Sequence, residues 1–397
     1  MKNRLLSNRL QNISYSQTIA MSAKARELKN KGYDVINLSL GEPDFLPPNF
    51  VLNAAKKAID EGYHYYTPVS GYLELREVIC NKFYRDNKLK YTASQIVVST
   101  GAKQSIINVL LSILNKNDEV IIPSPYWVSY LQMVKFCEAC PVIVRTTIEN
   151  DFKINAEKLK KAITSKTKLF IFNSPCNPTG SVYSYEELKE LAEIFRKYPN
   201  VMILSDEIYE HISYSADKHV SIAEFSDIYD QVITLNGLSK AFSMTGWRIG
   251  YIGAPEWISK SCDKIQGQMT SCANSIAQRA AISALQSSPI EIGYMIKKFK
   301  KRRNLVLDLI KEIPGFQFNQ PNGAFYIFPN VSEFFGKKLY GRIMNNSDDF
   351  SNFLLDEAKV ATVSGSAFGD NKYIRISYAS SEEKIIEAFN RMKKVLL

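Results

Sequence analysis

Residues 168–206 read "KLFIFNSPCNPTGSVYSYEELKELAEIFRKYPNVMILSD", and this stretch indicates the class of fold. Its two ends, 168–174 and 201–206, are nearly continuous apolar runs of strand length. Such runs are typical of strands that are buried on both faces of a sheet. Between them lies a helical pattern that begins at Ser184 with Glu187 three positions later, the spacing of a capping box. The stretch therefore predicts a strand, a helix and a second strand parallel to the first.

The same alternation continues on both sides of this stretch. Further strand candidates occupy residues 95–100, 119–124, 141–146, 231–236 and 248–254. Alternation of strands and helices over this length predicts an α/β fold with a mostly parallel central sheet.

The C-terminal part of the chain has a different pattern, with short strands mixed with helices. A long helical pattern at 288–312 ends before Pro314-Gly315 and is a natural connector. The first forty residues are too few for a core of their own, and we expect them to pack on the C-terminal part or on another subunit. We predict a large domain of residues 46–310 and a smaller domain formed by residues 1–45 and 311–397.

The composition is that of a soluble globular protein, with 45% hydrophobic and 23% charged residues in 397. No apolar run approaches the roughly 20 residues that cross a bilayer. The N-terminal residues scatter Arg and Asn among apolar positions, unlike a signal peptide. We expect a cytoplasmic protein without a membrane partner.

The net charge of +10 raises the question of a nucleic-acid partner. The densest basic run, Lys297 to Asn304, lies in the long helical pattern, where Met295, Phe299, Leu305 and Leu309 could form an apolar stripe. We interpret the run as a solvated helix face and expect no nucleic-acid partner. The charge is also consistent with anionic small ligands.

The six cysteines do not predict a metal centre or a disulfide framework. Cys137 and Cys140 form one CxxC pair, but a zinc site would need a second pair or nearby histidines, and the chain has three histidines in all. Two half-buried thiols are the simpler interpretation.

Reactive, aromatic or phosphate-binding residues follow five of the predicted strands. In open α/β sheets, ligands bind beyond the carboxyl ends of the strands. The residues concerned are Gly101-Ala102-Lys103, Pro125-Tyr126-Trp127, the segment "PCNPTG", Asp206 with Tyr209, and Lys240.

The segment "LNGLSKAFSMTGWRIG" (235–250) places two cations, Lys240 and Arg248, in a glycine-rich stretch. A lysine becomes a useful nucleophile only when its pKa falls from about 10.4 toward neutrality, and burial and a nearby cation both lower it. An arginine suits a phosphate because its planar guanidinium binds two oxygens at once. A lysine imine beside an anchored phosphate suggests pyridoxal 5'-phosphate. The alternative is an ordinary surface lysine.

Asp206 and Tyr209 fit the other needs of that cofactor. A carboxylate facing the pyridine nitrogen holds a proton there, which strengthens the ring as an electron sink. Tyr209 could donate to the ring's phenolic oxygen. The alternative for Asp206 is a cap on a following helix.

The strand-to-helix turn at Gly101-Ala102-Lys103 could bind phosphate, since a helix N-terminus presents free N–H groups. Its alternative is a routine turn. Trp127 could stack on a flat ring or belong to the core. Asn177 lies in a strong turn signal that would hold its amide at the rim. Arg375 lies among apolar residues and would bind either a substrate carboxylate or a structural partner.

Together these segments resemble the class I aminotransferases, and most of all the bacterial aspartate aminotransferases that contain "MTGWRIG". The stretch "SKAFSMTGWRIG" is similar to the pyridoxal-lysine signature of the family. The segments "GEPDF" (41–45), "SPYWVSY", "SPCNPTG", "SDEIYE" and "YIRISYA" occur in the family's order and approximate spacing. The resemblance extends from about residue 10 to the end.

The resemblance implies a fold-type I pyridoxal-phosphate-dependent transferase that forms a homodimer with shared active sites. It implies that Lys240 binds the cofactor and later carries a proton, that Asp206 faces the pyridine nitrogen, and that Trp127 stacks on the ring. Tyr209 and Asn177 would hold the ring oxygen. The phosphate would be bound or adjoined by Gly101, Ala102, Lys103, Ser239, Arg248 and, from the neighbouring subunit, Tyr66. The resemblance also implies cis peptide bonds before Pro125 and Pro178.

The resemblance further implies where the substrate binds. Its α-carboxylate would meet Arg375, Asn177 and the backbone of Gly41, next to Trp127. For the side-chain carboxylate of aspartate, Lys103 is the candidate, with the hydroxyl of Thr18 contributing. The implied reaction is a ping-pong transfer of the amino group from L-aspartate to 2-oxoglutarate, giving oxaloacetate and L-glutamate.

Other reactions on the same scaffold stay open at this point. They are another class I aminotransferase, using aromatic amino acids, alanine or prephenate, and a β-lyase that releases ammonia and pyruvate. Relatives that accept prephenate carry a basic residue near the position of Ser14, which this chain lacks. A non-enzymatic regulator would need a DNA-binding domain, for which we see no spare segment. Cys176, beside Asn177, suggests the hypothesis that the site is sensitive to oxidation.

Overall fold

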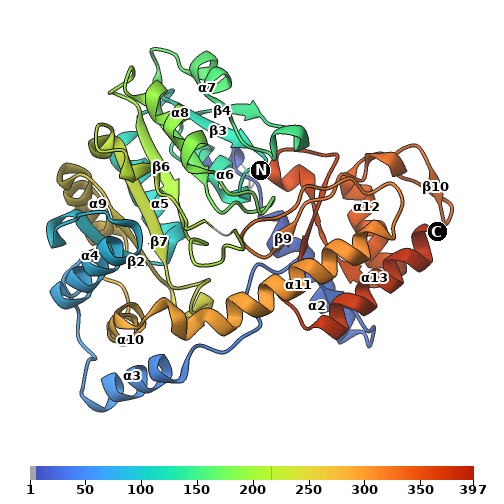
Figure 1. The fold of residues 1–397 in the computed structure, drawn as a ribbon, viewed down its shortest axis with the longest axis horizontal. Coiled ribbons are helices and arrows are strands. Elements are labelled where there is room, and N and C mark those ends of the chain that lie inside the picture. The colour runs from blue at the N-terminus through green and yellow to red at the C-terminus, as the bar shows by residue number, and fades with distance from the viewer. Residues whose placement is uncertain (1–5, 216) are drawn as a thin grey trace.

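The computed structural model describes residues 6–215 and 217–397. Figure 1 shows a body built on a large sheet, a second body formed mainly by the C-terminal part, and the long helix α11 running between them. The large sheet consists of β2 (Ile96–Thr100), β3 (Glu119–Ser124), β4 (Cys140–Arg145), β5 (Thr167–Asn173), β6 (Met202–Asp206), β7 (Val232–Gly237) and β8 (Ile249–Gly253).

The sheet has the order β2-β8-β7-β6-β5-β3-β4. All neighbouring pairs are parallel except those of β8, which is antiparallel to both β2 and β7. The seven predicted strands are therefore confirmed, each to within one residue at either end. Because β8 runs against the other strands, its first residue lies at the edge where they end.

The helices lie on both faces of this sheet and in the second body. They are α1 (Asn8–Gln11), α2 (Gln17–Asn30), α3 (Asn49–Asp60), α4 (Leu73–Asn87), α5 (Ala102–Ile113), α6 (Val128–Phe136), α7 (Ala156–Ala162), α8 (Tyr185–Phe195), α9 (Glu256–Met269), α10 (Ser275–Gln286), α11 (Gly293–Lys311), α12 (Ser347–Phe353) and α13 (Glu382–Leu396). The predicted capping box at the start of α8 is present, with Ser184 and Glu187 bonding to each other's backbone N–H groups.

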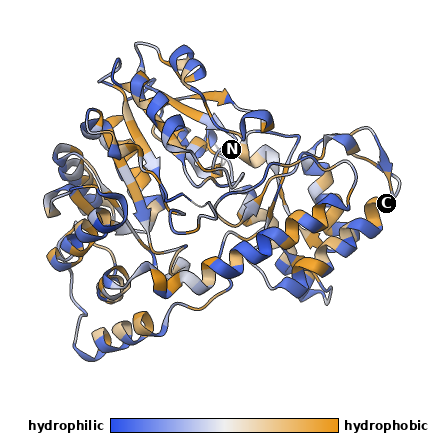
Figure 2. Ribbon diagram, in the orientation of Figure 1, coloured by the Kyte–Doolittle hydropathy of each residue, from blue (hydrophilic) through white to orange (hydrophobic). Residues whose placement is uncertain are grey.

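The side chains of each strand point alternately to two cores. Val98 of β2 packs in one core with residues of α4, α8 and α10, such as Ile79. Its neighbour Val97 packs in the other core with residues of α5, α6 and α9, such as Ile106. Figure 2 shows the apolar strands enclosed between helices that carry polar residues on their outer sides. Burial on both faces explains why the strands read as continuous apolar runs.

The second body is built on three short sheets. β9 (Tyr326–Ile327), β13 (Val363–Ser364) and β14 (Ile374–Ser377) form an antiparallel sheet in the order β13-β14-β9. β1 (Ile36–Asn37) pairs in parallel with β12 (Val360–Ala361), and β10 (Lys338–Leu339) pairs with β11 (Arg342–Ile343).

The N-terminal segment packs on both bodies. Helix α2 contacts β12 and β13 of the C-terminal part, as the sequence predicted, whereas α1 contacts α6 beside the large sheet. We propose that residues 46–310 form the large domain and that residues 1–45 and 311–397 form the small one, since α11 crosses between the two bodies (Figure 1).

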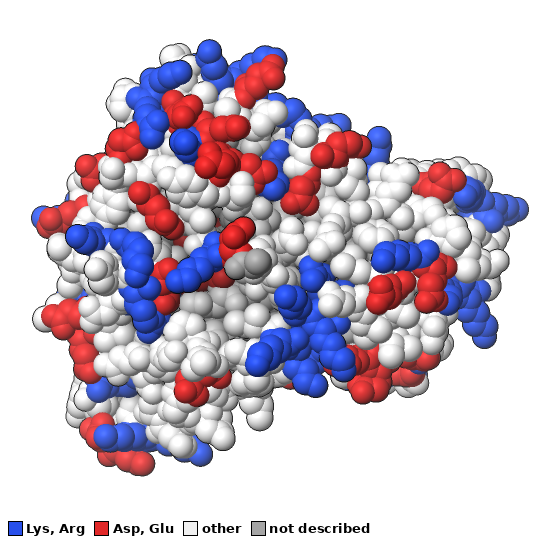
Figure 3. Space-filling view, viewed as in Figure 1, with Lys and Arg blue, Asp and Glu red and all other residues white. Residues whose placement is uncertain are grey.

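The basic run on α11 is only partly a solvated face. Its four lysines at 297, 298, 300 and 301 are exposed, and Figure 3 shows basic side chains gathered over this part of the surface. Arg302 and Arg303, however, are buried. Arg302 forms a two-pronged ion pair with Asp44, at 2.6 and 2.8 Å. The prediction of a solvated run is therefore wrong for these two arginines.

The apolar stripe of α11 also differs from the predicted one. Met295 and Phe299 are buried, but the stripe continues through Val306 and Ile310. The predicted positions Leu305 and Leu309 are only half-buried. The two buried arginines occupy the turn between the apolar positions, where Arg302 pairs with Asp44 and Nη1 of Arg303 donates to the carbonyl of Pro321 at 3.0 Å.

Among the described residues, no helix is long and apolar enough to cross a membrane. All six cysteines are free thiols. Cys137 is half-buried as expected, whereas Cys140 is exposed, so the expectation of two half-buried thiols is wrong for Cys140. Within the described part of the chain, neither belongs to a group of side chains with metal-ligand geometry.

Candidate active site

A cavity of about 520 Å³ lies at the edge of the large sheet where most strands end. Its size is ordinary for a small-molecule site. Twelve of the residues predicted from sequence line it: Thr18, Gly41, Ala102, Lys103, Trp127, Asn177, Asp206, Tyr209, Ser239, Lys240, Arg248 and Arg375. The rule that ligands bind beyond strand ends therefore located the cavity.

The reversed strand β8 explains how Arg248 reaches this edge. Arg248 precedes β8, and its backbone adopts the left-handed conformation with φ of 58°. Its guanidinium lies against Gly101, where a β-carbon would come within 2.2 Å of Nη2. Gly101 has φ of 81° and ψ of 157°, a region that side chains rarely adopt. Only glycine at 101 lets the arginine reach the start of α5.

Lys240 extends from the loop after β7 into the cavity. Its Nζ donates to the carbonyl oxygen of Gly41 at 2.6 Å. Burial lowers the pKa of Lys240 to about 8; the charges of Arg375 and Arg248 lower it too, against an opposing effect of Glu42. The lowered pKa agrees with the sequence argument, but burial is its largest cause, and the charge of Arg375 lowers the pKa more than that of Arg248 does. An amine with this pKa is partly neutral near pH 7, as a nucleophile requires.

Asp206 is buried at the end of β6, and both of its oxygens have donors. Tyr130 of α6 donates to Oδ2 at 2.5 Å, and the backbone N–H of Ile208 donates to Oδ1 at 3.2 Å. Burial raises the pKa of Asp206 to about 6, while these two hydrogen bonds lower it. The segment after Asp206 forms turns rather than a helix. The alternative of a helix cap is therefore wrong.

Tyr209 and Tyr326 meet in the cavity wall. Their hydroxyl groups are 2.8 Å apart. Tyr326 of β9 also lies under Arg375, whose guanidinium is 4.5 Å from the ring centre. The hydroxyl of Tyr326 would be 2.6 Å from a β-carbon at position 41, so Gly41 leaves room for it. Tyr326 thus links residues that the sequence predicted to bind the cofactor and the substrate.

Arg375 of β14 is 2% exposed and has no carboxylate partner among the described residues. Its Nη1 donates to Oδ1 of Asn177 at 2.9 Å, and its Nη2 donates to the carbonyl of Ser39 at 2.6 Å. Its Nε is buried without a hydrogen-bond partner. A buried donor without a partner is costly. The geometry therefore favours an external anion over the structural ion pair that the sequence left open.

Asn177 and its neighbours form a tight loop after β5. The backbone N–H of Asn177 donates to Asn173 at 2.8 Å, and Asn173 in turn donates to the carbonyl of Asp206 at 2.7 Å. The peptide bonds before Pro125 and Pro178 are cis as predicted, and the bond before Pro175 is cis as well. This loop fixes the amide of Asn177 against Arg375.

Lys103 and Trp127 lie together at the cavity. Nζ of Lys103 is 5.1 Å from the ring centre of Trp127. Burial, and then the charge of Arg248, lower the pKa of Lys103. Thr18 of α2 lines the same cavity, and its hydroxyl is 2.8 Å from that of Ser16. Lys103 is thus a cation without a carboxylate partner among the described residues.

Tyr66 lies apart from this cavity and is 90% exposed. The resemblance assigns it to the neighbouring subunit's site, and that role stays a prediction.

The sequence analysis missed several residues that line the cavity, among them Arg26, Ser129, Asn173 and Tyr326. Asn173 ends β5, one residue before the predicted end of that strand, so the strand-end rule could have found it. Arg26 and Tyr326 come from elements outside the large sheet, where that rule does not apply.

Cys176 does not have the properties of a reactive thiol. Burial raises the pKa of its thiol to about 11. A protonated thiol is a poor nucleophile and oxidises slowly. The structure therefore opposes the hypothesis of an oxidation-sensitive site.

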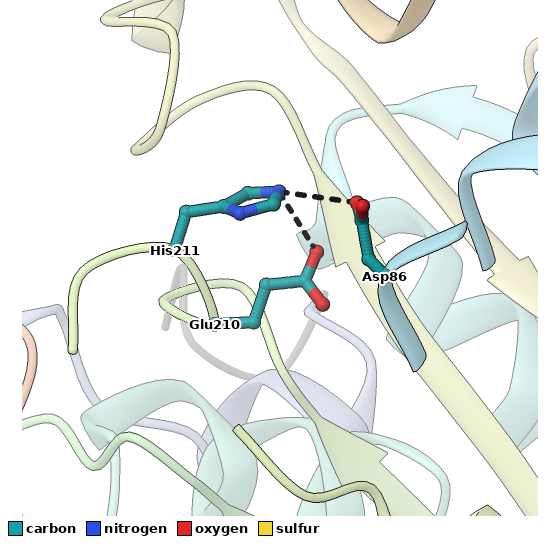
Figure 4. Close-up of side chains that lie close together, drawn as sticks. All are labelled: Asp86, Glu210 and His211. Carbon is teal, nitrogen blue, oxygen red and sulfur yellow. Dashed lines mark ion pairs between the residues drawn. The ribbon is translucent and has the colours of Figure 1, made fainter. Parts of the chain in front are cut away.

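A second cluster of charged side chains lies behind the segment that carries Asp206. The ammonium of Lys82, which has no exposed surface, contacts Glu210 and is 3.8 Å from Oδ2 of Asp86. Nε2 of His211 is 3.3 Å from Glu210 and 3.7 Å from Asp86, as Figure 4 shows. Burial would raise the pKa of Glu210, but the charges of Lys82 and His211 hold it well below its usual value.

We interpret this cluster as structural rather than metal-binding. Asp86, Glu210 and His211 have metal-ligand spacing, but the ammonium of Lys82 already compensates the two carboxylates. Glu210 directly follows Tyr209, which lines the cavity together with Asp206. The cluster therefore anchors the segment whose other side chains form the cavity wall.

The residues present fit pyridoxal phosphate. The partly neutral amine of Lys240 suits its aldehyde, and the buried carboxyl of Asp206 suits its pyridine nitrogen. The approach of Arg248 to Gly101, at the start of α5, forms a cationic cradle that a β-carbon would fill, and it suits a phosphate. Arg375 lines the same cavity and has no carboxylate partner among the described residues, so it suits a second anion.

Comparison with known proteins agrees with this geometry. Residues 33–392 match the family model described as aminotransferase class I and II. A probable aspartate/prephenate aminotransferase of Rickettsia bellii is 47% identical over 98% of both chains. A bifunctional aspartate aminotransferase and glutamate/aspartate-prephenate aminotransferase of Petunia hybrida is 44% identical over 99% of this chain and 83% of its own length.

Solved structures show the same fold. An aspartate aminotransferase from Rhizobium meliloti superimposes with a TM-score of 0.95 at 40% identity, over 98% of both chains. The aspartate aminotransferase from Thermus thermophilus, solved with maleate, has a TM-score of 0.93 at 38% identity, over 98% of this chain and 99% of that one.

Proposed function

This chain belongs to the class I and II aminotransferase family, whose members depend on pyridoxal phosphate, and from that premise we propose that it transfers the amino group of L-aspartate to 2-oxoglutarate. The products are oxaloacetate and L-glutamate, formed in two half-reactions that use the same cavity in turn.

One observation carries the choice of a dicarboxylic substrate, namely that Arg375 and Lys103, which have no carboxylate partner among the described residues, both line the cavity around Lys240. Arg375 lines the cavity with a guanidinium that has no carboxylate partner among the described residues, and Lys103 lies beside Trp127. Aspartate and glutamate each carry two carboxylates. An α-carboxylate on Arg375 and a side-chain carboxylate on Lys103 would compensate both cations.

The relatives support the same choice. Those most similar in sequence and structure are named for aspartate, and one solved relative holds maleate, a dicarboxylate. The names of the relatives and the two cations therefore both indicate a cavity that binds dicarboxylates.

The cavity residues divide the work of holding the cofactor. Pyridoxal phosphate, when bound, supplies an aldehyde for the amino group and a ring that withdraws electrons from the substrate's Cα. We assign its phosphate to Ser239, Arg248 and the backbone N–H groups of Gly101, Ala102 and Lys103, its ring face to Trp127, its nitrogen to Asp206, and its ring oxygen to Tyr209 and Asn177. The ion pair at the nitrogen requires that Asp206 be charged, which its pKa of about 6 permits at neutral pH.

Lys240 moves the proton. Its neutral amine would take the proton from the substrate's Cα, and the ammonium group so formed would deliver that proton to the C4' carbon of the cofactor. The carbonyl of Gly41 accepts a hydrogen bond from Nζ and so orients the amine. Arg375 and Asn177 hold the α-carboxylate, which fixes the Cα–H bond relative to the lysine.

We also propose a cytoplasmic homodimer. Tyr65 and Tyr66, after α3, are 85% and 90% exposed, an unusual state for adjacent aromatic residues. A second copy that covers them would bring Tyr66 to the phosphate of its neighbour's site. Sedimentation at several protein concentrations tests the dimer, and a monomer with full activity would contradict it.

Initial rates over a panel of amino donors with 2-oxoglutarate test the substrate. Aspartate should give the highest kcat/KM, with oxaloacetate as product, and Lys240→Ala should abolish turnover. Release of ammonia and pyruvate would instead identify a β-lyase. A preference for alanine or aromatic donors would contradict the pairing of Lys103 with a second carboxylate.

Prephenate is the second candidate substrate, because the first relatives carry it in their names. Ser14 is exposed and has an uncharged side chain, so it supplies no cation for the second carboxylate of prephenate. Its backbone N–H donates to Gln132 at 2.9 Å. Arg26 lines the cavity and is a cation that the sequence analysis did not consider. Turnover of prephenate by the wild type that is lost in Arg26→Ala would show that prephenate is a substrate and that Arg26 binds it. No turnover of prephenate by the wild type would exclude this substrate.

A further inference from the structure

The hydroxyl of Tyr130 contacts Asp206, and the proposed reaction has so far given this contact no role. Tyr130 belongs to α6, is 1% exposed, and lines a small internal cavity rather than the active site. Its hydroxyl donates to Oδ2 of Asp206 at 2.5 Å. Its ring packs edge-on against Trp127, with the ring centres 5.3 Å apart.

We propose that Tyr130 is a positioning residue for the aminotransferase reaction, whose hydroxyl keeps Asp206 charged and aimed at the pyridine nitrogen of the cofactor. This inference rests on the proposed function, because the charge on Asp206 matters only if a ring nitrogen faces it.

The direction of the hydrogen bond follows from the chemistry of the two groups. An ionised carboxylate can only accept, so the phenol must donate to it. Burial raises the pKa of Tyr130 well above its usual value, which keeps the hydroxyl protonated at any pH where the protein works. A donor that never loses its proton favours the charged form of its acceptor.

Other charged and titratable groups that influence Asp206 do not replace this donor. Glu207 raises the pKa of Asp206, and Lys240 lowers it, but both effects are smaller than that of the phenol. Tyr209 and Cys176 lie near the pair, and burial raises their pKa values, so both are neutral. The backbone N–H of residue 208 is the other donor, and a side-chain substitution does not remove it.

The fold gives Tyr130 a second positioning role. Trp127 and Tyr130 are one helical turn apart at the start of α6. Trp127 faces the cavity, while Tyr130 reaches the acid at the end of β6 from behind. One turn of helix therefore sets the position of the stacking ring relative to the acid.

The test measures the acid itself, in the protein without cofactor. The carboxyl carbons of aspartate are labelled with ¹³C, the Asp206 signal is identified by its loss in Asp206→Asn, and its pKa is read from the chemical shift. Tyr130→Phe should raise this pKa by about one pH unit, the size expected for a lost hydrogen bond to a charged group. Replacing Tyr130 by 3-fluorotyrosine, a stronger donor of nearly the same shape, should lower it.

The matched control is Tyr91→Phe. Tyr91 is also buried, and its hydroxyl bonds to Thr234 at 3.0 Å, away from the cavity. This variant should leave the titration of Asp206 unchanged. In the enzyme with cofactor, Tyr130→Phe should lower kcat about tenfold, the factor that matches one pH unit, with little change in KM for aspartate.

An unchanged pKa of Asp206 in Tyr130→Phe, or equal shifts in both phenylalanine variants, would overturn the inference. If Tyr130→Phe does not fold, the fluorotyrosine protein decides, because an unchanged or raised pKa contradicts the donor role. Failure of the proposed function looks different. The wild-type protein would then not transaminate, while the carboxyl titration would still respond to residue 130.

Discussion

Replacing Lys82 by methionine should destabilise the protein strongly, although Lys82 lies outside the active site. The two side chains have similar length, but methionine leaves Glu210 and Asp86 without their ammonium partner, and Glu210 is only 3% exposed. Breaking a buried ion pair by removing one partner costs about 3–5 kcal/mol. For 397 residues the entropy of unfolding is about 0.8 kcal/mol/K, so the midpoint of thermal unfolding should fall by about 4–6 °C.

The assay is calorimetry of the wild-type and variant proteins at equal concentration, with the double variant Lys82→Met/Glu210→Gln beside them. The double variant removes both charges and should recover part of the loss, because no unpaired carboxylate stays at position 210. The surface variant Lys57→Met is the matched control. Lys57 pairs with Glu61 at 3.4 Å in an exposed i,i+4 arrangement, and its loss should barely change the midpoint.

The pH dependence of this loss gives an independent check. The folded protein holds the pKa of Glu210 well below its usual value, so the stabilisation is present above the unfolded pKa of about 4.3 and is lost as the pH falls below it. The difference between wild type and Lys82→Met should therefore narrow below that pH. Equal midpoints at pH 7, or equal losses in the single and double variants, would refute the reasoning.

Three further predictions concern the active site. Gly101→Ala should weaken binding of pyridoxal phosphate at least tenfold by fluorescence titration, since a β-carbon would meet the arginine of the cradle and the backbone strain alone costs about 1–3 kcal/mol. Gly246→Ala, with open space around it, should bind normally. Lys103→Ala should lower kcat/KM for aspartate by roughly 10- to 100-fold more than for alanine, as a lost charged hydrogen bond implies, and equal losses would remove Lys103 from this role. Because burial lowers the pKa of Lys240 to about 8, the rate at which the cofactor-free protein captures pyridoxal phosphate should rise with pH around a midpoint near 8 and then level off. A midpoint near 10 would contradict the burial of the amine.

Much of the site followed from sequence because strand ends are local features. Lys103, Asp206 and Lys240 each follow an apolar run that could only be a buried strand, and parallel strands end at one edge. The position of each residue in the sequence was therefore enough to predict that these three side chains meet in one cavity. The resemblance to a known family then supplied roles that residue types alone do not distinguish.

Other contacts depend on elements that no local pattern connects. Tyr130 and Tyr326 are separated from Asp206 and Tyr209 by 76 and 117 positions, and the hydrogen bonds between them arise only when α6 and β9 pack on the sheet edge. The basic run on α11 shows the same limit. From the sequence, Arg302 was predicted to lie on a solvated helix face, but in the structure it pairs with Asp44, which is far away in the chain.

The sequence by itself determined the α/β class, the seven strands and the edge at which chemistry occurs, because apolar periodicity and turn residues act over a few positions. Only the tertiary structure decided that β8 is reversed, which brings Arg248 to that edge, and that Arg375 has a free donor rather than a structural partner. Strand direction and the pairing of buried charges depend on distant segments, and their energies exist only once those segments are packed together.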